Sequence, residues 1–448
     1  MVSRNSRFWL VAVLAWLSPA PLVAQTPPVP VRLSFADAVR RATGEAPAVE
    51  LATLRTDEAD ARVRQTRSGL LPSFSLGAAW VNRDFNWQAL GLPLPPAFAS
   101  GIPNPVPPFN NYDGRATVTQ TLFDWSTVGR MRAAHAQADG SRAERGVAVE
   151  TAAQVAALGY LRAARAEAVV AARQADSSIA AELVTLAQAQ KAAGVSAAID
   201  VTRARTELVR AEGLLIVAHN ARDRARIDLA RALGLDPATP LVLSDTLAAS
   251  LGSADLPANR DTLVAAALTG RPDLGAELAR AAAARRTGTA IRAERLPRIG
   301  LEADYGVNGL TVPSALGTRQ VALQVTLPIL DGFRREARAS EQDAIVRESQ
   351  VRERDLRQQI AADVDGALLD LRSAQAQQAV AAEQLRLAED ELSQSRERFK
   401  AGVAGNIEVI DAQANLIRAR DSDIDARFGS ASARVALARA AGVARTLH

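Results

Sequence analysis

The stretch IGLEADYGVN at residues 299–308 decides the fold. Its odd-numbered positions are apolar or aromatic, and its even-numbered positions are glycine or polar. This two-residue period is typical of a β-strand whose two faces meet different surroundings. Ten residues of a tilted strand are also about the length that crosses the apolar core of a bilayer. Alternation alone is compatible with either a half-buried sheet in a water-soluble domain or a sheet in a membrane.

Three further stretches show the same alternation, although one is weaker. SFSLGAAW at 73–80 and VALQVTL at 321–327 alternate regularly, and in TVTQTL at 117–122 threonine fills one face. Four strands cannot close into a barrel, and lipid does not tolerate the two open edges of such a sheet. A membrane location therefore requires several chains. We expect four strands in each chain, at about 73–87, 114–123, 298–308 and 318–328.

The same order of elements occurs twice along the chain. AGVSAAIDV at 193–201 matches AGVAGNIEV at 401–409, and LFD at 122–124 matches ILD at 329–331. Repeats of this kind indicate one structural unit used twice. The first copy has extra residues in the proline-rich segment 88–113, for which we expect a long exposed loop. The expected parts of the chain are a signal peptide (1–24), a first repeat (25–235), an equatorial connection (236–260) and a second repeat (261–448).

Long segments without proline follow each pair of strands. Alanine makes up 94 of the 448 residues, and it favours helix while burying little apolar surface. Leu356, Ile360 and Val364 recur every four residues, which indicates the narrow apolar seam of a coiled coil. The expected helices 47–70 and 196–233 together nearly equal the length of the expected helix 126–191, so we expect both to lie along it. The segments predict two helical hairpins, at 126–233 and 333–441.

Each hairpin has a tight turn. Gly194 and Gly402 are the residues expected to end the long helices, because glycine readily adopts the left-handed conformation of a helix C-terminus. Ser196 and Asn406 are the expected N-caps of the returning helices.

The first residues predict secretion. Two arginines precede the apolar stretch FWLVAVLAWL at 8–17, and small residues follow up to Ala24, where we expect cleavage. No later run of 18 apolar residues occurs, so we expect no membrane-spanning helix in the mature chain.

Composition excludes several classes of function. The net charge is +4 and nearly all positive charges are arginines, but they are interleaved with acids, so we expect no nucleic-acid partner. The absence of cysteine excludes disulfides, thiolate metal sites and acylated cysteine anchors. Three scattered histidines, with no phosphate-binding glycine loop and no zinc-type spacing, favour neither an enzyme nor a cofactor or metal.

Six short motifs lie in order along both copies: LSFADAV at 33–39, GLLPS at 69–73, LFDW at 122–125, RPDL at 271–274, LPILDG at 327–332 and FKAGV at 399–403. With these motifs the chain resembles the TolC family of outer-membrane efflux proteins. The resemblance implies an α+β membrane protein, a homotrimer that combines a 12-stranded transmembrane β-barrel with a long α-helical coiled-coil barrel. It implies an exit duct of a tripartite efflux or type I secretion system, in the outer membrane and the periplasm. The implied partners are outer-membrane lipid, a periplasmic adaptor and an inner-membrane pump that supplies energy.

The resemblance also implies site residues. The periplasmic gate of the family has acidic side chains at the positions of Glu408 and Asp411, although TolC has aspartate at both. Rings of three carboxylates would attract cations. A simpler interpretation is that Glu408 favours the helix N-terminus and that Asp411 is solvated. TolC has an arginine at the position of Ala404, so that gate contact is absent here or is made elsewhere.

Two further groups of residues follow from the same resemblance. Glu302 and Asp304 would face the lumen of the barrel. The hairpin tips, with Gly194, Val195, Gly402 and Val403, would dock the adaptor. An alternative function is a periplasmic or surface coiled-coil adaptor without channel activity, which would be soluble in water.

Overall fold

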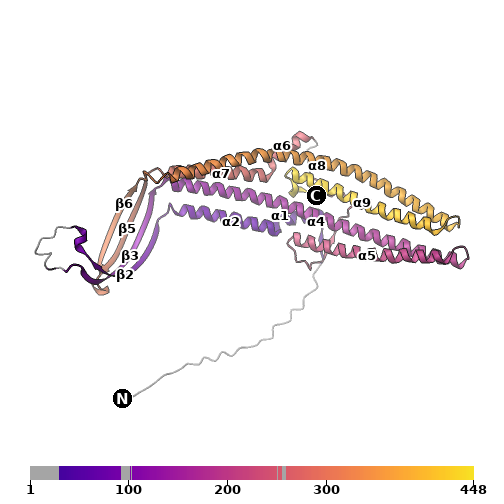
Figure 1. The fold of residues 1–448 in the computed structure, drawn as a ribbon, viewed down its shortest axis with the longest axis horizontal. Coiled ribbons are helices and arrows are strands. Elements are labelled where there is room, and N and C mark those ends of the chain that lie inside the picture. Colours follow the sequence, from indigo (N-terminus) through magenta and orange to yellow (C-terminus); the bar gives the residue numbers. More distant parts are fainter. Residues whose placement is uncertain (1–29, 92–100, 102, 250, 255–258) are drawn as a thin grey trace, which may run out of the picture.

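The computed structural model describes residues 30–91, 101, 103–249, 251–254 and 259–448, and the expected signal peptide lies outside them. The chain is an elongated rod with a β-sheet at one end and helices along the rest (Figure 1). Among the described helices, none is both long enough and apolar enough to cross a membrane.

One antiparallel sheet contains the four expected strands. They are β2 (Ser73–Phe85), β3 (Val106–Phe123), β5 (Arg298–Gly309) and β6 (Leu316–Thr326), in the order β2-β3-β5-β6. β3 begins eight residues before the expected start at 114, so the expected loop at 88–113 is too long. The reason is non-local, because β3 pairs with β2 back to the contact of Val106 with Phe85.

The helices form one layer in which the two copies lie side by side. α2 (Pro47–Ser68) and α5 (Ala198–Ala232) both pack along α4 (Trp125–Ala192), one after the other, as expected from their lengths. In the second copy, α7 (Pro272–Ala293) and α9 (Asn406–Ala440) pack along α8 (Arg334–Lys400). Figure 1 shows the order α8, α7, α4, α2 near the sheet and α8, α9, α4, α5 toward the hairpin tips.

Small residues allow the two copies to approach closely. α7 packs against both α8 and α4. At Gly129 of α4, a Cβ atom would lie 2.8 Å from the Cα of Ala290 on α7. Alanines of α4 such as Ala153 and Ala156 are completely buried. The high alanine content therefore serves close packing between helices.

The turns at the tips confirm two expectations and contradict two. Gly194 and Gly402 have φ values of 77° and 71° just after the long helices. Ser196 is not the N-cap of α5, because its hydroxyl instead donates to the carboxylate of Asp200 at 2.7 Å. Asn406 is not an N-cap either. It is the first residue of α9, it is buried, and its amide donates to the Asp200 carbonyl of the other hairpin at 2.8 Å.

A compact core lies at the equator, halfway along the rod. α1 (Phe35–Glu45) packs on α4, and β1 (Val31–Leu33) pairs in parallel with β4 (Leu241–Leu243) from the segment between the copies. Ser34 caps α1 by accepting the Asp37 N–H. The short helices α6 (Arg260–Gly270) and η3 (Ala444–Thr446) complete this region. Its largest buried side chains include Tyr160, Phe35, Leu161, Leu229 and Leu241.

Candidate channel surface and gate

The sheet has one apolar face that none of the described residues covers. The register aligns Phe74, Val118, Ala303 and Val321 across the four strands, on the same side. Phe74 is 66% exposed and Val321 is 73% exposed. Large apolar side chains that remain exposed in a continuous row indicate a surface that meets lipid or another chain.

The opposite face is polar. The adjacent register aligns Ser75, Thr117, Asp304 and Gln320. Alternation along each strand thus gives an apolar and a polar surface, as expected from the sequence. Glu302 lies two residues from Asp304 on this polar face and is exposed.

Asp304 belongs to a network of charges that the sequence interpretation missed. Arg115 forms an ion pair with Asp304 on the neighbouring strand, and its guanidinium donates to both carboxylate oxygens of Asp113 at 2.9 and 3.2 Å. Gly306 faces Arg115 in the register, and a Cβ atom there would lie 2.5 Å from the Gly114 carbonyl oxygen. The polar face therefore carries a fixed cation between two acids, whereas Glu302 forms no ion pair with any residue that the structure describes. The spacing of Asp113 and Arg115, two residues apart in a strand, is the sequence signal for this network.

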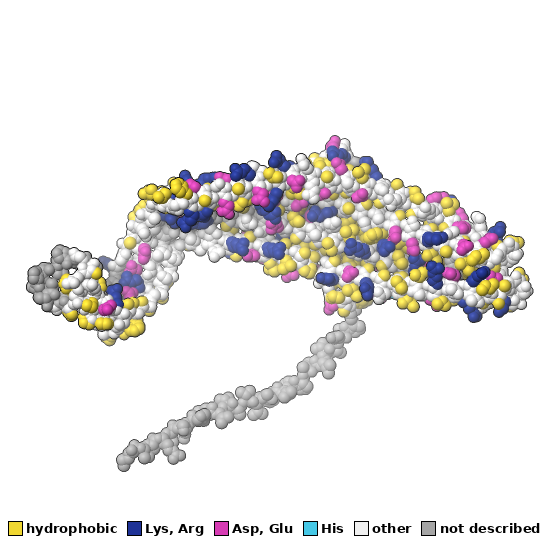
Figure 2. Space-filling view, in the orientation of Figure 1, with side chains coloured by type: hydrophobic (Ala, Val, Ile, Leu, Met, Phe, Trp, Pro, Cys, Tyr) yellow, Lys and Arg dark blue, Asp and Glu magenta, His cyan; other side chains and the backbone are white. Residues whose placement is uncertain are grey.

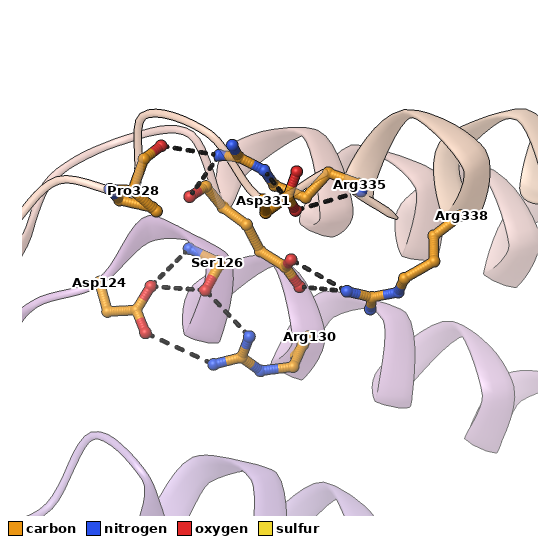
Figure 3. Close-up of polar contacts among 8 residues, drawn as sticks. Asp124, Ser126, Arg130, Pro328, Asp331, Arg335 and Arg338 are labelled. Carbon is orange, nitrogen blue, oxygen red and sulfur yellow. Dashed lines mark hydrogen bonds and ion pairs between the residues drawn. The ribbon is translucent and has the colours of Figure 1, made fainter. Parts of the chain in front are cut away.

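The first strand–helix junction is held by Asp124. This residue is the N-cap of α4, and it accepts hydrogen bonds from the backbone N–H and the hydroxyl of Ser126 (Figure 3). It also accepts hydrogen bonds from the backbone N–H and the hydroxyl of Thr127. Burial alone would raise the pKa of Asp124, but these bonds and nearby Arg130 together lower it below its usual value.

The second strand–helix junction has the corresponding aspartate, Asp331, but an arginine side chain makes most of the contacts there. The side chain of Arg335 is buried, and it donates to Asp331 at 3.0 Å, to the Pro328 carbonyl at 3.1 Å and to the Glu294 carbonyl at 3.4 Å (Figure 3). One guanidinium thus joins the ends of β6 and α7 to the start of α8. Just before α8, Phe333 has a φ of 62°, which is strained for a bulky residue. The contacts of Arg335 hold the turn that contains Phe333 in this conformation.

The two hairpin tips lie against each other. Val195 and Val403 are 65% and 69% exposed. A Cβ atom on Gly402 would lie 3.7 Å from Val195, so both turns contribute to one surface. The structure brings Gly194, Val195, Gly402 and Val403 together at the end of the rod that is farthest from the sheet (Figure 1).

The two expected gate acids have different surroundings. Glu408 lies in the first turn of α9, and Arg398 of α8 donates to it at 3.1 Å. Asp411 is exposed, and no ion pair to it is found among the described residues. The two carboxylates therefore lie near the tip, but within one chain only Asp411 keeps an uncompensated charge.

A partly buried charged cluster links the two hairpins, and sequence reasoning did not find it. Arg173 of α4 donates to Asp176 at 2.9 Å and also pairs with Asp421 of α9, and Arg420 of α9 donates to Asp176 at 2.6 Å. The Asp176 side chain is only 2% exposed. Burial alone would lower the pKa of Arg173, but its hydrogen bonds to Asp421 and Asp176 outweigh burial and raise it. Only the spacing of three residues between Arg173 and Asp176 was visible in the sequence.

Charged side chains of both signs are interspersed over the helical surface (Figure 2). The described residues contain no cluster of three or more histidine, cysteine or acidic residues that could hold a metal.

Comparison with known proteins decides the family. Outer membrane efflux proteins match residues 38–235 and 263–443, which is most of the chain. The chain belongs to this family. It is therefore an exit channel in the outer membrane with a periplasmic extension, and the family consists of channels rather than enzymes.

Two kinds of relatives support this assignment. Protein CyaE of Bordetella pertussis is 27% identical over 397 residues, covering 88% of this chain and 80% of CyaE. The CmeC outer membrane channel of Campylobacter jejuni has a TM-score of 0.75 at 16% identity, covering 92% of this chain and 86% of CmeC. The outer membrane protein VceC of Vibrio cholerae has a TM-score of 0.70 at 19% identity, covering 91% of this chain and 96% of VceC. At these identities the two solved structures show a shared fold.

Proposed function

We propose that three copies of the chain close into one channel, with a 12-stranded barrel in the outer membrane and a helical tube in the periplasm. The observation that carries this proposal is the sheet, which has one apolar and one polar face and two open edges. In lipid, open edges leave backbone groups unpaired at a cost of several kcal/mol each. Pairing β6 of one copy with β2 of the next removes every edge.

In the closed barrel the polar face lines the lumen. Glu302 then faces the passage as a free carboxylate, whereas Arg115 compensates Asp304. The lumen therefore combines fixed charges of both signs, which suits a wide duct for varied substrates better than a narrow ion filter.

The gate lies at the periplasmic end, near the hairpin tips. Threefold symmetry places three copies each of Glu408 and Asp411 around the axis. Because Arg398 compensates Glu408, Asp411 supplies most of the negative potential of the gate. The exposed turns with Gly194, Val195, Gly402 and Val403 dock a periplasmic adaptor, which couples the duct to an inner-membrane pump. A water-soluble adaptor without channel activity is a weaker alternative, because it leaves the apolar face of the sheet uncovered.

Single-channel recording in a planar bilayer tests this function. We expect discrete conductance steps with a preference for cations. Replacing both gate acids, Glu408→Ala with Asp411→Ala, lowers the cation preference or raises the conductance. Asp57→Ala on α2, an exposed acid far from the tips, is the matched control and changes neither. A wild-type protein that inserts into the bilayer but never conducts contradicts the proposed function, and a double variant identical to wild type contradicts only the gate.

A further inference from the structure

The apolar face of the sheet carries a charged side chain, Arg319 of β6. The register pairs Arg319 with Tyr305 of β5, on the side of the sheet that also holds Phe74 and Val321. At the other described positions that pair across this face, the residues are apolar, aromatic, amide or glycine. Arg319 is exposed and forms no ion pair with any residue that the structure describes.

Hydrocarbon alone is a poor environment for this charge. An arginine on the lipid-facing side of a barrel is costly near the middle of the membrane and much less costly near either surface. Tyr305, the cross-strand partner of Arg319, lies seven residues after Arg298 at the helix end of β5 and four residues before Gly309 at its other end. That other end points away from the helices (Figure 1). Arg319 therefore belongs to the outer half of the membrane, where an anionic lipid group can offset its charge.

A hollow lies one row outward from Arg319 on the same side of the sheet. It has a volume of about 430 Å³, and its lining includes Ala78, Gly114 and Val307, which are paired across three strands. Gly317 continues this row on β6. Because two residues of the row are glycines, a group from outside can approach the strands closely there.

Two polar groups adjoin the inner side of the hollow. A Cβ atom on Gly317 would lie 3.6 Å from the Tyr305 hydroxyl oxygen, so this hydroxyl lies over the glycine row, beside Arg319. One row is about 7 Å, a distance that the arginine side chain can span. Asp113 also lines the hollow, but Arg115 compensates its charge at 2.9 Å. A guanidinium and a hydroxyl that can donate to one group suit a phosphate.

An aromatic pair borders the outer side of the hollow. Trp80 and Tyr112 are paired across β2 and β3, and both line the hollow. The Trp80 indole N–H and the Asn82 amide both donate to the Asn110 side-chain oxygen, at 3.2 and 2.9 Å. Tryptophan and tyrosine are enriched at the level where lipid headgroups begin. Aromatic rings offer an apolar surface to the face of a sugar ring, and amide groups bond to its hydroxyls.

We propose that this surface binds a phosphorylated glycolipid of the outer leaflet. The phosphate meets Arg319 and Tyr305, the sugar lies against Trp80 and Tyr112, and the acyl chains follow the apolar rows toward Val321. The proposal rests on the barrel of the proposed function, in which this face is the lipid-facing one. A glycolipid fits because the uncompensated charge is positive, the rim is aromatic and amide, and the hollow is continuous with the lipid-facing surface.

Lipid binding to the purified protein in detergent, measured by native mass spectrometry, tests this proposal. The probe is lipid A, which is a phosphorylated glycolipid. The comparison lipids are dephosphorylated lipid A, which keeps the sugar, and phosphatidylglycerol, which keeps a phosphate without a sugar. Wild type is expected to bind lipid A about tenfold more tightly than either comparison lipid.

Four variants locate the binding. Arg319→Gln is expected to lower the affinity for lipid A about tenfold, whereas Arg319→Lys keeps most of it because the charge remains. Gly114→Leu also lowers the affinity, because its side chain fills the hollow; its Cβ atom would lie 3.8 Å from Val307, which is ordinary contact. Arg298→Gln is the matched control. It removes an exposed arginine from the polar face at the helix end of β5 and leaves the affinity unchanged.

The outcomes separate this inference from the proposed function. Equal affinity of wild type and Arg319→Gln for lipid A overturns the site, and equal affinity of wild type for phosphatidylglycerol and lipid A overturns the glycolipid as its occupant. Planar-bilayer recording of each variant checks that it still forms the channel. A wild-type protein that conducts but does not bind lipid A contradicts this inference alone, whereas a protein that never conducts contradicts the proposed function.

Discussion

At the equator the apolar side chains are buried against other parts of the chain, whereas on the sheet most of them are left exposed by the described residues. Phe35 and Tyr160 are 1% and 0% exposed, and their rings meet edge to face at 5.7 Å. The Tyr160 hydroxyl donates to the Leu33 carbonyl, and burial raises the pKa of this side chain to about 12. On the sheet, Leu76 and Val321 are 75% and 73% exposed.

The difference indicates that the two regions are stabilised in different ways. The equator buries apolar surface in a core of its own, so we expect it to fold as a property of the single chain. Among the described residues the sheet leaves most of its apolar face exposed and two edges open, so we expect its stability to depend on lipid and on neighbouring copies.

The strongest test of the comparison replaces one phenylalanine in each region. Phe35→Ala removes a buried ring and costs about 3–5 kcal/mol of the free energy of unfolding. Phe74→Ala removes an exposed ring of the sheet and changes the same free energy by less than about 1 kcal/mol. Urea unfolding in detergent, followed by far-ultraviolet circular dichroism, measures both. Equal losses would mean that the sheet has a core like that of the equator.

The next test uses adjacent residues of β6 on opposite faces. Val321→Arg puts a charge on the apolar face and costs about 2–4 kcal/mol near the middle of a membrane, so less protein inserts into lipid vesicles. Gln320→Arg puts the same charge on the polar face, where water remains, and insertion is unchanged. Flotation of vesicles after refolding compares the inserted fractions. Similar losses for both variants would contradict the assignment of faces.

A smaller effect is expected where the sheet joins the helices. Asp124→Asn keeps an N-cap but loses the carboxylate that Arg130 and the hydroxyls stabilise, at a cost of about 1 kcal/mol at neutral pH. The lowered pKa of Asp124 fixes the sign of the pH dependence. Its contribution is present above the unfolded pKa near 3.8 and is lost as the pH falls through the lower folded value.

Unfolding of wild type and Asp124→Asn between pH 7 and pH 3 checks this dependence. The difference in stability between the two proteins should shrink below about pH 4. A difference that stays constant over this range would show that the ionised carboxylate does not hold the junction.

The smallest effects are expected at the tips, where the proposed trimer would bring the acids of different copies together. Asp411→Asn removes the free charge and lowers the ratio of cation to anion permeability, on the order of twofold, because exposed charges are screened by salt. Arg398→Gln releases Glu408 and raises that ratio. Reversal potentials in a salt gradient measure both variants. Shifts in the same direction for the two variants would contradict the pairing of Arg398 with Glu408.

Much of the fold follows from local patterns in the sequence. The period of two at 299–308 predicted a strand, and β5 covers it. The long helices and the glycines after them were also predicted, because helix period and left-handed turns are properties of neighbouring residues. The early start of β3 was missed, since it depends on pairing with β2. Asn406 was wrongly expected to be an N-cap because its amide has a partner on the other hairpin.

The candidate site was less accessible to sequence reasoning. Arg398 compensates Glu408 across a turn, and Arg173 pairs with Asp421 from a distant helix. Such pairs depend on which helices become neighbours, which neither spacing nor composition specifies. The roles of Glu302, Glu408, Asp411 and the tips stay predictions, because they concern a symmetric assembly and its partners.

The central claim is that the single chain has a complete hydrophobic core at its equator but forms a channel only when three copies assemble. Electron cryomicroscopy of the purified protein in lipid nanodiscs tests this claim most directly. We predict a hollow threefold tube with 12 strands, with Val321 toward lipid and Glu302 toward the lumen. A monomer, or an assembly in which the polar face of the sheet meets lipid, would contradict the account.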